Sequence, residues 1–199
     1  VGPMWSKVGT LHLKPGENLL KVTDLKTDAR IDRIYIGTCP PFPGDPAAII
    51  PAAEYVQSRD SREGRIVTVP QLGFSDGVLV QPFDTPSYDI SNIEDAPYVE
   101  YSLDLEAGDN MVEIRTLPTL HIYEGRDARY AASLDGTVAE VFSIHTDDFS
   151  AEWRRNVLHG YSSRKLYAPM PEAGKRTLRI SFLDPGIVLQ EIRVNNITE

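Results

Sequence analysis

The sequence predicts an all-β protein built as a β-sandwich. Short apolar stretches recur along the chain, and each ends at a group of turn-forming residues such as Asp135-Gly136 or Asp184-Pro185-Gly186. Strands at such regular spacing are typical of two packed sheets. The chain has 199 residues, and a chain of this length buries about 70% of its unfolded surface. It can therefore form a core without disulfides or bound metals to hold it.

The first 45 residues predict a β segment that ends in a linker. Three strands are expected, at residues 6–13, 19–22 and 31–36, and a turn at residues 15–18 separates the first two. The stretch from Cys39 to Pro46 contains four prolines, which exclude regular structure. We therefore divide the chain into residues 1–45, a hairpin segment with a Pro-rich linker, and residues 46–199, the main sandwich.

Two arrangements of the N-terminal segment stay open. Its strands are either the closing half of a preceding module or hairpins that join the rest in a single larger sandwich. Half a sandwich cannot bury its apolar face alone, so the segment must pack against something in either case.

The rest of the chain predicts nine strands and one helical turn. The strands are expected at residues 65–69, 78–80, 98–105, 111–117, 129–134, 139–144, 165–168, 176–182 and 189–194. Turns are expected between them at residues 106–110, 135–136, 172–175 and 184–186. The helical turn is expected at residues 148–155.

The charge pattern excludes several classes of partner. The net charge is −9, and residues 41–120 hold 14 acidic against four basic residues. An acidic surface repels nucleic acid and anionic membranes, so neither is an expected partner. Residues 121–180 are close to balanced, with nine basic and eight acidic residues, and can tolerate a uronic acid. The single cysteine, Cys39, permits no intrachain disulfide.

Four segments of the C-terminal half carry a family resemblance. They are Leu-Pro-Thr at 117–119, Arg-Tyr-Ala-Ala-Ser-Leu-Asp-Gly at 129–136, Trp-Arg-Arg-Asn-Val-Leu at 153–158 and Asp-Pro-Gly-Ile-Val-Leu at 184–189. Their order and spacing resemble the C-terminal β-sandwich domain of the family 115 glycoside hydrolases, which are xylan α-glucuronidases. The resemblance covers roughly residues 50 to 196.

A repeated pattern adds a second resemblance. Residues 10–18 and 102–110 both run from a strand into an x-Gly-acidic-Asn turn and out into another strand. Both look like the strand-turn-strand units of galactose-binding-like sandwiches, the jelly-roll class that contains the carbohydrate-binding modules of families 6 and 35. The resemblance therefore implies a galactose-binding-like sandwich with an additional N-terminal β segment.

The family resemblance also implies a function. It implies a non-catalytic, carbohydrate-binding accessory domain of a secreted or periplasmic polysaccharide-degrading enzyme, with xylan or another hemicellulose as the target. The partners would be a polysaccharide or oligosaccharide, the catalytic domain of the parent enzyme, and a second copy in a homodimer. Two alternatives stay open: a structural docking or dimerisation module without a sugar site, and a fragment that completes a glycosidase active site in trans.

One sequence motif and two pairs of adjacent acidic residues, Asp147-Asp148 and Glu94-Asp95, are the features that could indicate catalysis. Residues 73–77 (Gly-Phe-Ser-Asp-Gly) match the nucleophile elbow around Ser75, but the residues that follow are strand-like where the elbow requires a helix. A β-turn is the better interpretation. A glycosidase needs two carboxyl groups about 5–10 Å apart, and the sequence places no such pair. We therefore expect that the chain has no catalytic site of its own.

Aromatic and basic side chains are the expected sugar-binding groups, because a pyranose face is apolar and its edge accepts and donates hydrogen bonds. The aromatic candidates are Trp153, Tyr161 and Tyr123, with Trp5 and Tyr130 behind them. Core packing is an equally good interpretation of Trp153. Arg126, Arg129 and His121 flank a glycine-containing loop, where either arginine can hold a uronate bidentately. Their alternative is an ion pair with Glu124 or Asp127.

The resemblance to family 6 and 35 modules also implies a structural calcium ion. Glu54 resembles the acidic residue on the first strand of family 6 and 35 modules, which helps to bind a structural calcium ion. Gln190 stands where those modules have a second acid, and its amide oxygen supplies a ligand without a charge. The four histidines lack metal-ligand spacing along the chain, so each is expected to be an isolated core or surface residue.

Overall fold

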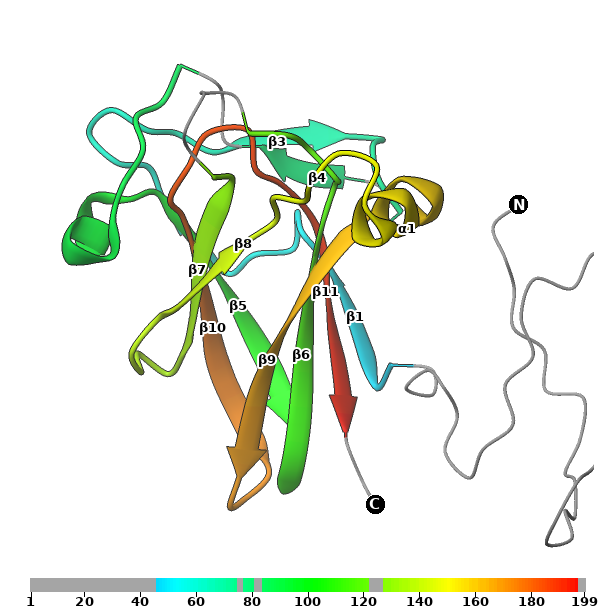
Figure 1. Ribbon diagram of the computed structural model, residues 1–199. Helices are drawn as coiled ribbons and strands as arrows, with labels where there is room; N and C mark the ends of the chain where they lie inside the picture. Colours follow the sequence, from blue (N-terminus) through cyan, green and yellow to red (C-terminus); the bar gives the residue numbers. More distant parts are fainter. Residues whose placement is uncertain (1–45, 75–76, 81–83, 122–126, 197–199) are drawn as a thin grey trace, which may run out of the picture. The chain divides into compact units, whose positions relative to one another are not determined.

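The computed structural model describes residues 46–74, 77–80, 84–121 and 127–196. These residues form two antiparallel sheets that face each other (Figure 1). The predicted all-β sandwich is therefore confirmed. The elements in chain order are β1 (Ala48–Pro51), β2 (Gln57–Arg59), β3 (Val67–Pro70), β4 (Gly77–Val80), η1 (Ile90–Asp95), β5 (Tyr98–Leu105), β6 (Gly108–Thr116), β7 (Arg129–Leu134), β8 (Glu140–Ser143), α1 (Ala151–His159), β9 (Ser162–Met170), β10 (Gly174–Phe182) and β11 (Val188–Asn196).

The strand order shows how distant segments become neighbours. One sheet has the order β3-β4-β11-β6-β9, and β1 also pairs with β11. The other sheet has the order β2-β5-β10-β7-β8. The last strand, β11, therefore lies at the centre of its sheet, where it pairs with β1, β4 and β6.

No helix among the described residues is long and apolar enough to span a bilayer.

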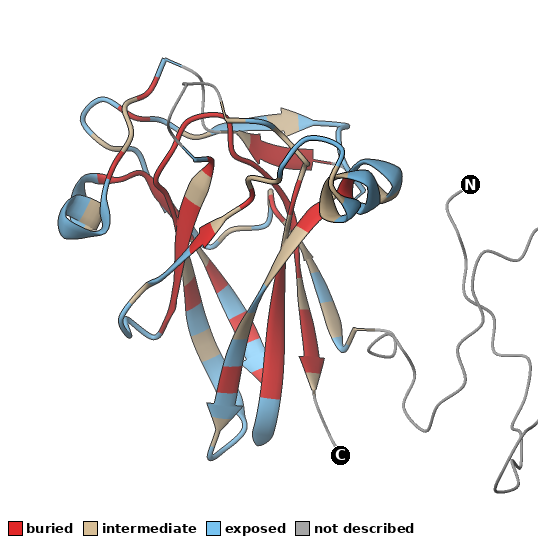
Figure 2. Cartoon of the chain, viewed as in Figure 1, coloured by how far each residue is buried: buried red, intermediate tan, exposed pale blue. Residues whose placement is uncertain are grey.

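The core lies between the two sheets and follows the two-residue period of the strands. Along β5, Val99, Tyr101, Leu103 and Leu105 are buried, while the residues between them are more exposed (Figure 2). Side chains such as Ile180 of β10 and Ile192 of β11 are fully buried in the same cluster. Burial raises the pKa of Tyr101 well above its usual value, and its hydroxyl donates to the Ala52 carbonyl at 2.7 Å.

The expected bounds fit some long strands better than others. β9 spans Ser162–Met170 where only residues 165–168 were expected, and β6 and β10 begin inside the turns expected at 106–110 and 172–175. The expected strands at residues 98–105 and 129–134 coincide with β5 and β7. The short strands β1 and β2 were missed, because three or four residues give no clear alternation. The strands and linker expected within residues 1–45 lie outside the described residues.

The helix α1 begins three residues later than the helical turn expected at residues 148–155 and ends four residues later. Ser150 caps its N-terminus by accepting a hydrogen bond from the Trp153 amide at 3.0 Å. Gly160 ends it in the left-handed conformation, with φ of 73°. The helix lies at the end of the sandwich where the β6–β7 and β10–β11 connections also lie (Figure 1).

Candidate functional site

The start of α1 presents two aromatic rings, which we call the α1 platform: Phe149 and Trp153. Their ring centroids are 5.1 Å apart. The Phe149 side chain is 72% exposed and Trp153 is half-buried. Trp153 is therefore neither a core residue nor fully exposed, and Phe149 is an exposed aromatic residue that sequence reasoning missed.

The backbone holds Phe149 in an unusual conformation. Its φ is +61°, a region that a bulky residue rarely adopts. Arg154 stabilises this turn, because its Nε and Nη2 donate to the Phe149 carbonyl at 3.0 and 2.9 Å. Strained backbone of this kind is concentrated at binding sites.

Charged side chains lie on α1 and on the neighbouring strand β9. Arg154 and Arg155 are exposed on the helix, and Arg164 of β9 pairs with Glu152 at 2.9 Å. Arg164 also donates to the Ser143 carbonyl at 2.7 Å. Within the part of the chain that the structure describes, no hydrogen bond or ion pair engages the Arg155 guanidinium. Arg154 contacts the turn of the platform and can meet a carboxylate there, whereas Arg155 follows Trp153 by two residues and so lies on another side of the helix.

Gln190 joins the C-terminal end of α1 to the loop before β4. Its Nε2 donates to the Gly160 carbonyl at 3.0 Å, and its Oε1 accepts from the Phe74 amide at 3.3 Å. The Phe74 ring lies edge-on to Tyr161, with centroids 6.2 Å apart. The structure therefore brings together Gln190 and Tyr161, two residues that were predicted for different roles.

One face of the Tyr161 ring is covered by a charge network. The Arg115 guanidinium lies 3.9 Å from the ring centroid. Arg115 in turn pairs with Glu113 at 3.1 Å and Glu191 at 3.2 Å, and Arg193 pairs with Glu191 at 2.7 Å. Since Arg115 occupies that face, Tyr161 has less ring surface for a sugar than Phe149.

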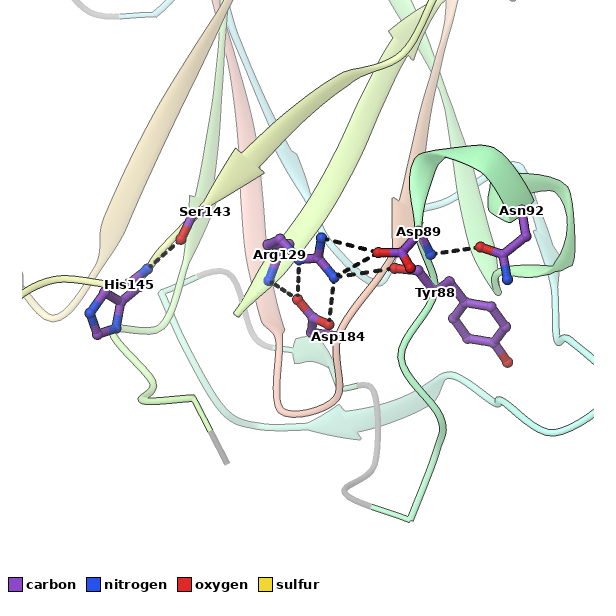
Figure 3. A network of polar contacts seen from close by, with 7 residues as sticks. All are labelled: Tyr88, Asp89, Asn92, Arg129, Ser143, His145 and Asp184. Carbon is purple, nitrogen blue, oxygen red and sulfur yellow. Dashed lines mark hydrogen bonds and ion pairs between the residues drawn. The ribbon is translucent and has the colours of Figure 1, made fainter. Parts of the chain in front are cut away.

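The Arg129 guanidinium is engaged within the domain. Its Nε donates to Asp184 at 2.7 Å and its Nη2 at 3.2 Å, and a second contact at 3.4 Å reaches Asp89 (Figure 3). The hydrogen bond to Asp184 is the main cause of the raised pKa of Arg129. An ion pair was one of the two interpretations of this residue, but its partner is Asp184 in place of Glu124 or Asp127.

His121 does not stand alone, which corrects the expectation of isolated histidines. Its Nδ1 lies 3.3 Å from Nδ1 of His145, which follows β8. The sequence could not show this contact, because 24 residues separate the pair. Both side chains are half-buried.

The remaining candidates divide into two groups. Tyr130 is buried and packs against Phe142, with centroids 5.5 Å apart, so it belongs to the core, and burial raises its pKa. Tyr123, Arg126, Ser75 and Trp5 lie outside the described residues.

The turn that carries Glu54 is joined to the backbone of Gln190, the second residue expected at a calcium site. Glu54 is exposed in the turn after β1, and the Ala52 amide in the same turn donates to the Gln190 carbonyl at 2.9 Å. The Gln190 amide oxygen already accepts one hydrogen bond but has a second lone pair. In the described part of the chain, no group of three or more His, Cys, Asp or Glu side chains is arranged to hold a metal ion. The remaining ligands would have to be carbonyls and water.

A polar pocket of about 440 Å³ lies beside β2 and η1. Arg59, Arg62, Tyr88, Asn92 and Glu94 contribute to its lining. Arg59 is held in place, because its guanidinium lies 4.7 Å from the Tyr98 ring centroid and donates to the carbonyls of Glu94 and Ala96. Sequence reasoning missed this pocket, since β2 and η1 were not predicted.

Comparison with known proteins agrees with this architecture. The model of the glycosyl hydrolase family 115 C-terminal domain matches residues 47–197. A solved family GH115 4-O-methyl-α-glucuronidase with specificity for decorated arabinogalactans is similar, with 23% identity and a TM-score of 0.64. The match covers 85% of this chain and 20% of that enzyme, so the chain spans about a fifth of its length. No curated protein matches the chain.

Two carbohydrate-binding modules are more distantly similar. One is the C-terminal family 6 module of a marine laminarinase from Zobellia galactanivorans, with 12% identity, a TM-score of 0.49 and coverage of 75% of this chain and 98% of the module. The other is a family 35 module from Paenibacillus barcinonensis, with 15% identity, a TM-score of 0.46 and coverage of 75% and 98%.

Proposed function

The chain belongs to the family of glycosyl hydrolase family 115 C-terminal domains, and from this premise we propose that it binds carbohydrate as a non-catalytic accessory domain of a polysaccharide-degrading enzyme. The proposed target is xylan or another hemicellulose that carries uronic acid. The proposed partner in the same polypeptide or complex is the catalytic domain of the parent enzyme, in a secreted or periplasmic setting.

The α1 platform is the observation that carries this proposal. A sugar ring stacks on an aromatic ring because both faces are apolar, and the edges of the sugar then take hydrogen bonds. Phe149 is 72% exposed and its turn is held by two hydrogen bonds from Arg154. A ring that is fixed before the ligand arrives loses little entropy on binding, which favours affinity.

Arg154 beside the platform favours an acidic sugar. It uses Nε and Nη2 on the Phe149 carbonyl, which leaves Nη1 free to donate to a ligand. A guanidinium binds a carboxylate through charge-assisted hydrogen bonds. The sequence pointed to Arg126 or Arg129 for this role. Arg126 lies outside the described residues, and Asp184 and Asp89 engage the Arg129 guanidinium, so Arg154 is a better candidate than Arg129.

A direct titration tests the proposal. Calorimetry with glucuronoxylan oligosaccharides should give a dissociation constant of roughly 10 μM to 1 mM, which corresponds to about 4–7 kcal/mol. Phe149→Ala should weaken binding by about tenfold or more while the fold is kept, since the ring is exposed. Equal affinity in the two proteins would move the site away from the α1 platform.

A docking or dimerisation module is the second candidate function. Exposed apolar side chains continue along α1 and the loop beside it: Val157 is 49% exposed, Leu158 77% and Phe74 59%. An apolar surface of this kind also suits a protein interface. Light scattering of the chain at micromolar concentration, alone and as Leu158→Glu, separates the candidates: a dimer that dissociates in the variant supports docking.

Calcium is a further proposal for the same domain. The turn of Glu54 lies against β11 through the hydrogen bond from Ala52 to Gln190. Glu54 would supply the carboxylate and Gln190 an amide oxygen, and a bound ion would tie this turn to the central strand.

A further inference from the structure

We propose that His121 and His145 form a binding site for a divalent transition metal ion, with Zn²⁺ as the simplest probe. The two Nδ1 atoms face each other at 3.3 Å. The site lies at the junction of two connections, the segment after β6 and the segment between β8 and α1. It is separate from the calcium proposal, because Ca²⁺ prefers oxygen ligands and imidazole suits zinc and copper.

The separation of the nitrogens fits a shared ion. A Zn–N bond is about 2.0–2.1 Å long, and two such bonds at the tetrahedral angle place the nitrogens about 3.3 Å apart. A hydrogen bond between the two rings is the alternative interpretation of this distance. The rings are also inclined by 61°, with centroids 5.0 Å apart, so they meet edge to face and do not form a flat stack.

Neighbouring hydrogen bonds hold the backbone segments that carry both histidines. The His121 segment is held by the Leu117 amide on the Val188 carbonyl at 2.8 Å and by the Thr119 hydroxyl on the Gly186 carbonyl at 2.9 Å. The His145 amide donates to the Ser143 hydroxyl at 3.1 Å (Figure 3). Ligands that are already positioned lose little entropy on metal binding.

Two protein ligands define the kind of site. No third His, Cys, Asp or Glu joins the pair within the described residues, so water would complete the coordination sphere. Such a site binds more weakly than a four-ligand structural zinc site. Because His145 precedes Phe149 by four residues, a bound ion would restrain the loop that carries the α1 platform.

The test uses the full chain without a polyhistidine tag. Zinc titration by calorimetry should show one site in the wild type. His121→Ala and His145→Ala should each weaken it by about tenfold or more, as expected when one of only two ligands is lost. His159→Ala is the matched control, since His159 is also half-buried but contacts Tyr161, and it should bind zinc as the wild type does.

Two further readouts make the outcome decisive. Ring ¹⁵N shifts of His121 and His145 should change on addition of zinc and stay unchanged with calcium. The double variant His121→Ala/His145→Ala measures background binding elsewhere on the chain. If the wild type binds no more zinc than the double variant, the two rings share only a proton and the proposal is overturned.

Discussion

Arg129 and Asp184 form a bidentate ion pair that joins β7 to the β10–β11 turn. Besides the two guanidinium contacts, the Arg129 amide donates to Oδ2 of Asp184 at 3.0 Å. The Asp184 side chain is only 2% exposed, and that of Arg129 is 28% exposed. The carboxylate is therefore satisfied almost entirely by one residue, which gives Arg129 a structural role.

Arg129→Ala should destabilise the domain by about 3 kcal/mol, because it leaves a buried carboxylate without its charge partner. Urea unfolding measures the change. Arg65→Ala is the control, since its pair with Asp84 is exposed on both sides and should contribute about 0–1 kcal/mol. A stable Arg129→Ala protein that had lost glycan binding would instead return Arg129 to the sugar site.

Gly160→Ala should destabilise the domain by roughly 1–2 kcal/mol. Gly160 has φ of +73°, and a Cβ there would lie 3.3 Å from the Phe74 ring, so the substitution strains the backbone and displaces the ring. Gly174→Ala is the matched control, because Gly174 has no neighbour within 4 Å of an added Cβ and no positive φ. Equal thermal stability of the two variants would contradict the account of this helix end.

The alternation of apolar and polar residues and the types of turn residues predicted those elements whose structure is set by neighbouring residues in the chain. Long strands such as β5 alternate cleanly, and the turn at Asp135-Gly136 has the positive φ values of 49° and 73° that its residue types favour. The strands β1 and β2 depend on pairing with β11 and β5, which no short window of sequence contains. Their positions in the sheets follow from tertiary contacts, which appear only when the chain folds.

Of the two rings of the α1 platform, the sequence pointed to one. Trp153 was named from the sequence, but its neighbour Phe149 was not, because its exposure results from a backbone conformation that Arg154 stabilises. The His121–His145 contact and the Gln190 bridge each join residues far apart in the chain. The residue types indicated which side chains are suited to binding a sugar or a metal ion. Only the fold could show which of these side chains contact one another.

Ser75→Ala should leave the protein unchanged in any hydrolase assay. The sequence after residues 73–77 folds as β4 in place of the helix that a nucleophile elbow requires. Acetylated xylan and a chromogenic acetate are suitable substrates, and neither protein should turn them over. Turnover that depends on Ser75 would overturn the non-catalytic proposal.

Calcium should raise the melting temperature if Glu54 and Gln190 hold an ion, because a ligand that binds only the native state stabilises it by mass action. Thermal unfolding in millimolar CaCl₂ and in chelator measures the shift. Glu54→Gln should remove it, since the substitution keeps the size of the side chain but removes the charge. An identical melting temperature in both buffers would eliminate the calcium site.

Chemical-shift mapping with an aldouronic xylo-oligosaccharide tests the central claim most directly. The amides of residues 148–156 and the Trp153 indole N–H should shift in the wild type, and the shifts should disappear in Phe149→Ala. Tyr167→Ala, which removes an exposed aromatic ring near the far end of β9, should bind as the wild type does. Shifts confined to the pocket beside β2 and η1, or none with any xylan, mannan, pectin or glucan oligosaccharide, would contradict the α1 platform as the sugar site.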